Sequence, residues 1–204
     1  MNLNEVKELY IKQKKELAEL FGLETRNKYE ISDKNKKPIL YVAEQQKGFM
    51  GLIFRQILGH WRTFEIHVFK TDRSLFIRAI HPFRFFFQRL DVLDQHDNLL
   101  GSIQQRFAIF SKKFDVLDHH GKVLLRVSSP IWKIWTFPFF NQFKIEAARI
   151  EKKWSGLLKE AFTDADNFRL EFIDQNLTDD QRKILIASSI FIDLIYFEKK
   201  ANSN

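Results

Sequence analysis

The feature that most constrains the fold is an apolar run near the C-terminal end of the chain. Residues 184–197 are almost entirely apolar, and Asp193 is their only charged residue. A helix of these 14 residues would reach about 21 Å, whereas a membrane span needs about 20 residues to cross about 30 Å of hydrocarbon. We therefore expect a helix buried inside protein, with a single membrane span through 184–197 as the alternative. The side chains expected in this burial are Ile184, Ile190, Phe191, Leu194 and Phe197.

A helix that is apolar all round must be enclosed by other parts of the protein, and the preceding chain has the sequence pattern of strands that could enclose it. From residue 28 onward, short alternating or apolar runs are separated by polar turns, which is typical of β-hairpins. The sequence Asp-Val-Leu-Asp occurs at 91–94 and again 24 residues later, at 115–118, and the second aspartate of each begins a turn.

Roughly ten to twelve strands follow one another in this local order. An antiparallel meander of that length avoids exposed edges by closing into a barrel. We expect a mainly β fold, a closed antiparallel barrel of about 12 strands with the hydrophobic C-terminal helix in its bore.

The first residues follow a different period. Apolar residues recur mostly every three or four positions from Val6 to Phe21, with Asn4 as the N-cap and Gly22 as the end. This pattern predicts an amphipathic helix over residues 5–21. The chain would then divide into a helical extension, 1–26, and a barrel domain, 27–200.

Charge is distributed unevenly along the chain. The formal net charge is +7, but residues 1–163 hold 28 basic and 18 acidic residues, whereas residues 164–204 hold 5 and 8. A basic body predicts an anionic partner. We expect this partner to be an anionic phospholipid membrane. The alternatives are a nucleic acid and, as a third hypothesis, a protein that binds the helix at 5–21. The oligomeric state stays open.

Several residue types and motifs do not occur in the sequence. The absence of cysteine excludes disulfides, thiolate nucleophiles and S-acylation. The first residues show neither a signal peptide nor a myristoylation signal, so we expect a cytoplasmic protein that is peripheral on membranes. No nucleophile elbow, phosphate-binding glycine loop or His-Glu-x-x-His pair occurs, and we expect no enzyme with covalent chemistry.

Two segments resemble a known family residue by residue. Residues 154–168, from Trp-Ser-Gly-Leu-Leu to Asp-Ala-Asp-Asn-Phe, and the end of the apolar run at 191–198 closely resemble the C-terminal part of the phospholipid scramblase family. Shorter pieces that fit in order are 27–31, 41–44, 81–84 and 114–116. The resemblance covers about residues 27–198. It implies the barrel of tubby-like proteins, closed around a central helix, and calcium-stimulated, ATP-independent movement of phospholipids between leaflets of the plasma membrane.

The sequence departs from that family in two places where scramblases carry cysteines, and it lacks the family's proline-rich N-terminal region. Aromatic residues stand at both places, in 83–89 and 130–140, interleaved with Arg and Lys. Such a mixture suits the bilayer interface, so both segments are candidates for membrane docking, the alternative being that their rings fill the barrel. The candidate membrane-binding residues are Phe85, Phe87, Trp132, Trp135, Phe137, Phe139 and Phe140.

The resemblance also implies a calcium loop that begins at Asp164. Its oxygen ligands would come from Asp164, Asp166, the Phe168 carbonyl and Asp174. An EF-hand-like loop requires glycine at its sixth position, where this chain has Arg169, and the spacing to the last acid is one residue short. Residues 168–172 also alternate as a strand does, so the alternative is a hairpin turn at the aspartates. Calcium is the only cofactor expected.

Overall fold

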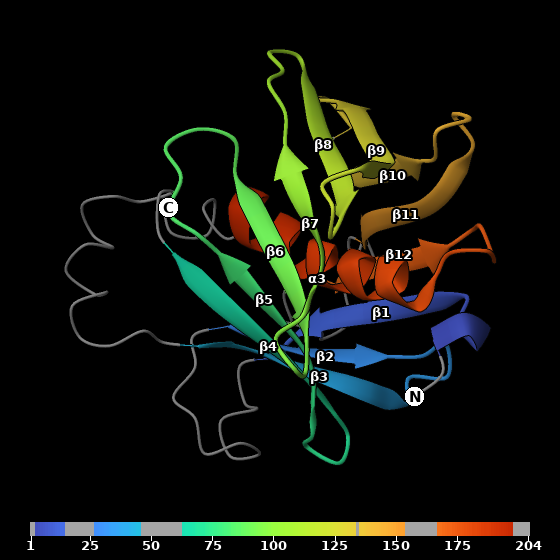
Figure 1. Cartoon of the computed structure of the whole chain (residues 1–204). Coiled ribbons are helices and arrows are strands. Elements are labelled where there is room, and N and C mark those ends of the chain that lie inside the picture. Colours follow the sequence, from blue (N-terminus) through green and yellow to red (C-terminus); the bar gives the residue numbers. More distant parts are fainter. Residues whose placement is uncertain (1–2, 15–26, 46–62, 134, 154–166, 198–204) are drawn as a thin grey trace, which may run out of the picture.

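Twelve strands and one long helix make up a computed structural model of the chain, which describes residues 3–14, 27–45, 63–133, 135–153 and 167–197. The strands close into one barrel, and helix α3 runs through its bore (Figure 1). The elements are η1 (Leu3–Glu5), β1 (Glu8–Gln13), β2 (Lys28–Ser32), β3 (Pro38–Gln45), β4 (Phe64–Lys70), β5 (Leu75–His81), β6 (Arg89–Asp94), β7 (Leu99–Gln105), β8 (Ser111–Asp118), β9 (Val123–Pro130), β10 (Thr136–Phe140), β11 (Glu146–Lys153), β12 (Asn167–Phe172) and α3 (Asp179–Tyr196).

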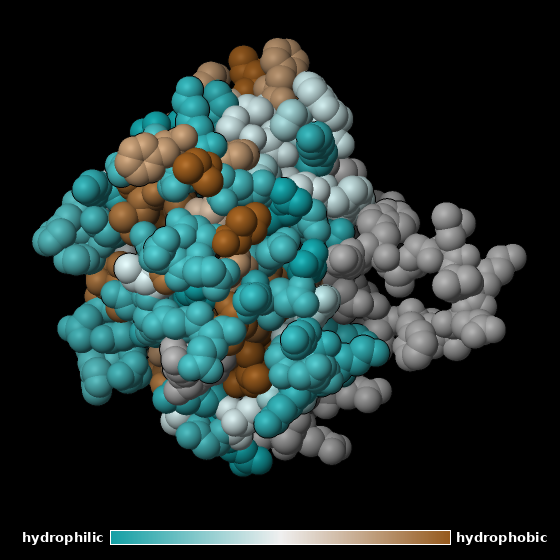
Figure 2. Space-filling view, turned by 90° about the vertical axis from the view of Figure 1, so that its right-hand side faces the viewer, coloured by the Kyte–Doolittle hydropathy of each residue, from teal (hydrophilic) through white to brown (hydrophobic). Residues whose placement is uncertain are grey.

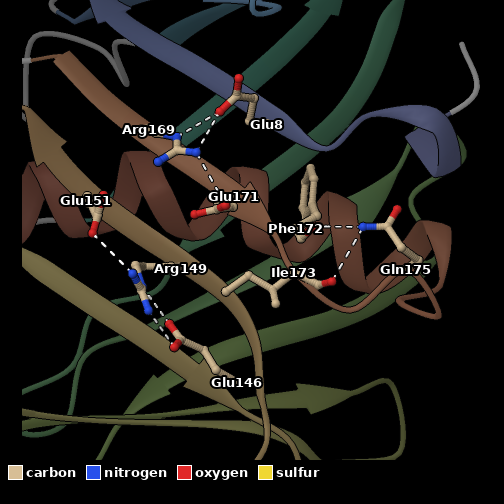
Figure 3. A network of polar contacts seen from close by, with 9 residues as sticks. All are labelled: Glu8, Glu146, Arg149, Glu151, Arg169, Glu171, Phe172, Ile173 and Gln175. Carbon is tan, nitrogen blue, oxygen red and sulfur yellow. Dashed lines mark hydrogen bonds and ion pairs between the residues drawn. The ribbon is translucent and has the colours of Figure 1, made fainter.

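Each strand pairs antiparallel with its neighbours in sequence, and β1 closes the barrel by pairing with β12. The register at this seam places Leu9 opposite Leu170, with both side chains in the core. On the outer surface Arg169 of β12 donates to Glu8 of β1 at 2.9 Å and also lies 3.3 Å from Glu171 (Figure 3). The seam is therefore bridged by apolar contacts inside and by an ionic ladder outside.

The helix has the environment that its sequence predicts. Ile184, Ile190, Phe191, Leu194 and Phe197 are all buried in the barrel core, at no more than 7% exposure. Thr178 begins the helix with a capping box to Gln181. Two polar side chains of the helix are paired inside the barrel: the Ser188 hydroxyl donates to the Ile184 carbonyl, and Asp193 accepts from the Tyr29 hydroxyl of β2 at 2.7 Å.

The mainly β barrel with a central helix is confirmed, whereas the alternative of a membrane span through 184–197 is wrong, because these residues pack against the strands. None of the helices in the described ranges has both the length and the apolar character that crossing a bilayer requires.

Close approach between α3 and the wall depends on one glycine. Gly101 of β7 has φ +155°, and a Cβ built there would lie 2.2 Å from the Leu117 carbonyl oxygen and 2.7 Å from Cδ1 of Ile184. Any side chain at this position would therefore displace the helix or the neighbouring strand. The bore is so closely packed beside Gly101 that a single added methyl group would have no room there.

The helix expected over residues 5–21 is wrong for the part that the structure describes. Residues 8–13 form β1, whose alternation places Leu9 and Ile11 in the core, and only Leu3–Glu5 form a short 3-10 helix. Pairing with β12 and β2 on either side overrides the local helical spacing. The barrel therefore begins at β1 and not at residue 27; residues 15–26 lie outside the described part.

The two ends of the barrel are built differently. At one end, tight turns join β2–β3, β6–β7, β8–β9 and β10–β11, and in each an Asp or Asn side chain accepts hydrogen bonds from backbone N–H groups two and four residues later; these acceptors are Asp33, Asp94, Asp118 and Asn141. The turn predicted at the second aspartate of each repeat is thus confirmed. At the other end, β5–β6, β7–β8 and β9–β10 are joined by residues 82–88, 106–110 and 131–135.

Candidate functional site

Exposed apolar side chains gather at the end of the barrel where β5–β6, β7–β8 and β9–β10 are joined. Three segments, 82–88, 106–110 and 131–133, carry aromatic and aliphatic residues that point into solvent, with exposures from 42% at Phe87 to 78% at Phe86. We call the exposed members the apolar rim: Phe83, Phe85, Phe86, Phe87, Phe107, Ile109, Phe110, Ile131 and Trp132. Figure 2 shows hydrophobic side chains at the top of the molecule, where Figure 1 places the β7–β8 connection, above a mostly hydrophilic face.

Contacts between the segments make the rim one continuous surface. The rings of Phe87 and Phe107 meet edge to face with their centroids 6.5 Å apart, and Gln105 N–H donates to the Gln88 carbonyl. On the other side Ile131 N–H donates to the Phe110 carbonyl at 3.3 Å. The rim is therefore held by the barrel wall and does not consist of three independent loops.

The charge of these segments is of one sign. Residues 82–89, 106–113 and 131–135 contain no acidic residue, and their six basic residues are Arg84, Arg89, Arg106, Lys112, Lys113 and Lys133. Arg89 reaches Asp91 on the wall at 2.6 Å, and Arg106 reaches Asp115 at 3.0 Å. Cations thus surround the apolar rim, while the acids that partly compensate them lie on the strands below.

Lys112 is the one basic residue of this group that is buried. Its ammonium donates to the Lys133 carbonyl at 3.0 Å and lies 3.9 Å from the centre of the Phe137 ring. Burial lowers the pKa of Lys112 to about 8, because removal from water penalises the charged form. The lysine ties β8 to the segment that carries Trp132.

Aromatic packing closes the bore beneath the rim. Trp135 stacks on Phe197 with ring centroids 5.1 Å apart, and Lys152 lies 4.1 Å above the same ring. Tyr196 packs edge to face on Phe114, and its burial raises the pKa of its hydroxyl to about 12. The C-terminal end of α3 therefore lies at the same end of the barrel as the apolar rim.

The seven candidate membrane-binding residues divide into three groups. Phe85, Phe87 and Trp132 belong to the rim. Phe137 and Phe139 were assigned wrongly, because they lie on the inner face of β10 and are fully buried. Trp135 packs on Phe197, and Phe140 lies half-buried on the outer wall of the barrel.

Sequence reasoning missed part of the rim and left an alternative open for another part. The apolar run at 107–110 stood between two predicted strands without an assigned role, although its lack of alternation could have marked it as a loop. For Phe83, Phe85 and Phe87 the alternative that their rings fill the barrel is wrong, since residues 82–88 form a connection and not a strand.

The opposite end carries a smaller apolar surface. Phe143 and Ile145 in the β10–β11 turn are 72% and 61% exposed, and Ile173 after β12 is 41% exposed. Lys144, between the first two, is exposed as well. This group offers a matched comparison for the rim, since its side chains are as exposed but lie a barrel length away.

The calcium ligands inferred from the resemblance do not come together in the described part of the chain. Asp164 and Asp166 lie outside it. Phe168 and Asp174 stand at opposite ends of β12, with about 13 Å of extended strand between Phe168 and Phe172 alone, whereas ligands of one calcium ion lie within about 2.6 Å of it. Asp174 accepts a hydrogen bond from Asn176 N–H in a turn. Among the described residues no group of three His, Asp or Glu side chains is placed to hold a metal.

Comparison with known proteins gives consistent results. The model of the family described as Scramblase matches residues 1–199. The chain is 26% identical to human phospholipid scramblase 2 over 97% of its own length and 69% of that protein, and 26% identical to human phospholipid scramblase 1 over 96% and 64%. It is 24% identical to altered inheritance rate of mitochondria protein 25 of Saccharomyces cerevisiae, over 97% and 72%. The chain thus spans about two thirds of the length of these relatives.

A solved structure supports the architecture. An X-ray structure of a protein from Arabidopsis thaliana superposes with a TM-score of 0.53 at 13% identity, covering 92% of this chain and 91% of the other. At that identity the likeness concerns the fold alone.

Proposed function

Because this chain belongs to the scramblase family, we propose that it is a phospholipid scramblase-like protein that docks on anionic membranes and takes part in ATP-independent movement of phospholipids between leaflets. Docking places the protein at the membrane surface as a peripheral protein, and the movement of lipids needs no covalent step. The apolar rim is the membrane-binding surface in this proposal.

One observation supports docking above all others: the three segments that carry the rim, 82–89, 106–113 and 131–135, contain basic residues and no acidic residue. Full burial of one large apolar side chain is worth about 2 kcal/mol, and each basic residue near an anionic surface adds about 1 kcal/mol. Stable membrane attachment needs two such signals together. The rim supplies both without a lipid anchor, on a chain that has no cysteine to carry one.

The test compares two double variants in which the replaced side chains have similar exposed fractions. Phe86→Ser with Trp132→Ser removes side chains that are 78% and 73% exposed on the rim, whereas Phe143→Ser with Ile145→Ser removes 72% and 61% exposed side chains at the opposite end. Co-sedimentation with phosphatidylcholine vesicles, with and without phosphatidylserine, measures binding. We expect the rim variant to bind at least about tenfold more weakly to the anionic vesicles and the opposite-end variant to bind as the unmodified protein does.

Equal losses in both variants, or none in either, would contradict docking through the rim. The same samples titrated with duplex DNA test the nucleic-acid alternative. Nonspecific DNA binding falls steeply as salt rises, whereas ring insertion shifts Trp fluorescence to shorter wavelength and persists in moderate salt. Tight DNA binding that the rim variant retains, without vesicle binding, would replace the membrane proposal.

Lipid movement is tested separately from docking. A fluorescent-lipid scrambling assay in proteoliposomes, with and without calcium, should show exchange between leaflets that the rim variant loses. Docking without exchange would leave the protein a membrane-binding member of the family and remove the transport proposal.

Calcium binding stays a prediction that involves Asp164 and Asp166. Isothermal titration of the full chain with calcium should give heats that Asp164→Ala with Asp166→Ala abolishes. Asp174→Ala should leave those heats unchanged, because Asp174 lies in the turn beyond the far end of β12. Identical traces for the unmodified chain and the double aspartate variant would end the calcium prediction.

A further inference from the structure

The outer wall of the barrel contains a groove that the rim does not include. Its volume is about 560 Å³, within the range of about 300–1,000 Å³ typical of small-molecule sites. The residues that line it are Arg106, Val123, Leu124, Arg126, Ser128, Phe140, Asn141, Gln142 and Lys144. They come from the end of β7, from β9, and from β10 with the turn that follows it.

The groove lies where the hydrogen-bonded pairing between β9 and β10 ends. Their ladder has only two residue pairs, Val127 with Phe139 and Arg126 with Phe140, and it is the shortest of the twelve ladders that join the described strands. Beyond Arg126 the ladder between the two strands stops, because β10 ends at Phe140 and continues into the β10–β11 turn, which Asn141 closes by accepting from Phe143 and Ile145 N–H. The space between them is left open to solvent on the outside of the barrel.

Three cations face this space. Nε of Arg106 lies 3.0 Å from Oδ1 of Asp115, but the angle at Arg106 does not make a hydrogen bond, and Arg126 lies 3.8 Å from the same oxygen. One carboxylate therefore serves two guanidinium groups. Lys144 makes no ion pair with any residue of the described ranges. The groove keeps a net positive charge, with guanidinium donors that remain available to an anion.

The floor between the cations is apolar. Val123 and Leu124 of β9 and the Phe140 ring of β10 line it, and Ser128 and the amides of Asn141 and Gln142 provide neutral hydrogen-bonding groups. A ligand that matches this lining combines an anionic oxygen group with aliphatic carbon. Arg106 also directly precedes Phe107 of the rim, so one end of the groove adjoins the surface on which lipids would be met.

We propose that this groove binds a single anionic phospholipid, with the anionic oxygens of its headgroup spread along Arg106, Arg126 and Lys144 and the first carbons of its chains on Val123, Leu124 and Phe140. The site goes beyond docking through the rim, because it holds one lipid molecule and does not require a bilayer. It would favour phosphatidylserine over phosphatidylcholine, because the serine carboxylate gives the former a net negative charge, whereas the choline cation leaves the latter neutral overall.

The experiment uses the full chain and water-soluble dihexanoyl phosphatidylserine below its micelle concentration, with isothermal titration as the readout. Arg126→Gln with Lys144→Asn removes two cations from the groove, and asparagine tolerates the φ of +60° at position 144. The control, Lys34→Gln with Lys37→Gln, removes two exposed cations from the β2–β3 turn. We expect the groove variant to bind at least about tenfold more weakly, and both the control and the rim variant Phe86→Ser with Trp132→Ser to bind as the unmodified chain does.

Three results would overturn the proposal. Equal affinity for inorganic phosphate would make the groove a simple phosphate site with no use for its apolar floor. Unchanged binding in the groove variant would place the lipid elsewhere. Loss of binding in the rim variant alone would assign the lipid to the rim, so that docking stands while the groove proposal fails. Circular dichroism of each variant verifies that the fold is retained.

Discussion

Arg182 is fully buried, yet it faces backbone carbonyls and not a carboxylate. Its guanidinium donates to the carbonyls of Leu177, Leu3 and Val6 at 2.8–3.1 Å and lies 4.7 Å from the centre of the Phe172 ring. Burial lowers the pKa of Arg182, with Asp179 and Asp174 acting in the opposite direction. One side chain therefore fastens the first residues of the chain to the start of α3.

We expect Arg182→Met to reduce the free energy of unfolding by about 3 kcal/mol or more, because each buried carbonyl left without a donor costs about 1–3 kcal/mol. The free energy of unfolding of Arg182→Lys should lie between those of the unmodified chain and Arg182→Met, since an ammonium replaces only some of the guanidinium's hydrogen bonds. Urea unfolding followed by circular dichroism measures the change. The control is Arg149→Met, whose partners Glu146 and Glu151 lie on the surface of β11 (Figure 3). It should cost less than about 1 kcal/mol, and an equal cost for both would contradict the anchoring role.

Single residues also show where sequence reasoning reaches its limit. Trp132 and Phe137 stand in one aromatic run, and nothing local separates the exposed ring from the buried one. The difference arises because β10 begins at Thr136, a boundary set by pairing with β11 and β9. Asp94 and Asp118 were predictable, because an aspartate that accepts from its own following backbone is a local event.

At the scale of elements, α3 was the most predictable part and β1 the least. The apolar run, the acids at its start and its length are all local properties of α3. The strand character of β1 depends on pairing with β2 and with β12, and the β12 residues stand more than 150 positions later in the chain. The helical spacing of apolar residues near the N-terminus was therefore a weaker determinant of local structure than strand pairing with a distant part of the chain.

The C-terminal end of α3 has no basic residue of its own, but the wall supplies two. Lys112 and Lys152 lie over the rings of Phe137 and Phe197 at this end, where the helix dipole is negative and favours cations. This arrangement places a titrating lysine between the helix and the rim.

Stability should rise with pH between about 8 and about 10 because of Lys112. In the unfolded chain this lysine keeps its proton to the usual pKa of 10.5, whereas in the folded state the pKa is about 8. The unfolded state therefore binds more protons in this window, and stability increases with pH. Above about pH 10 the raised pKa of Tyr196 acts in the opposite direction, so the measurement ends there.

Urea unfolding at successive pH values follows this change. Lys112→Met should flatten the rise, whereas Lys113→Met, one residue along on the other face of β8, should keep it. A rise that persists in Lys112→Met would assign the effect to another group.

On the scale of the whole molecule, the sequence was sufficient to predict the architecture, but it was insufficient to predict that exposed rings gather at one end of the barrel. Alternating strands, local order and an apolar helix require a filled barrel. The gathering of rings at one end depends on where the strands end and which segments therefore become connections at that end. That outcome combines nine side chains from three segments, so no single window of sequence contains it.

Closure of the barrel by β1 and β12 has a consequence for how the protein is made. Glu8 meets Arg169, and Arg182 holds the Leu3 and Val6 carbonyls. The first strand can pair with β2 early, but it finds β12 only after nearly the whole chain has left the ribosome. Until then a nascent meander has two open strand edges and an unfilled bore. Contacts of such long sequence separation make folding slow, and the growing chain would rely on chaperones to protect those edges from other chains.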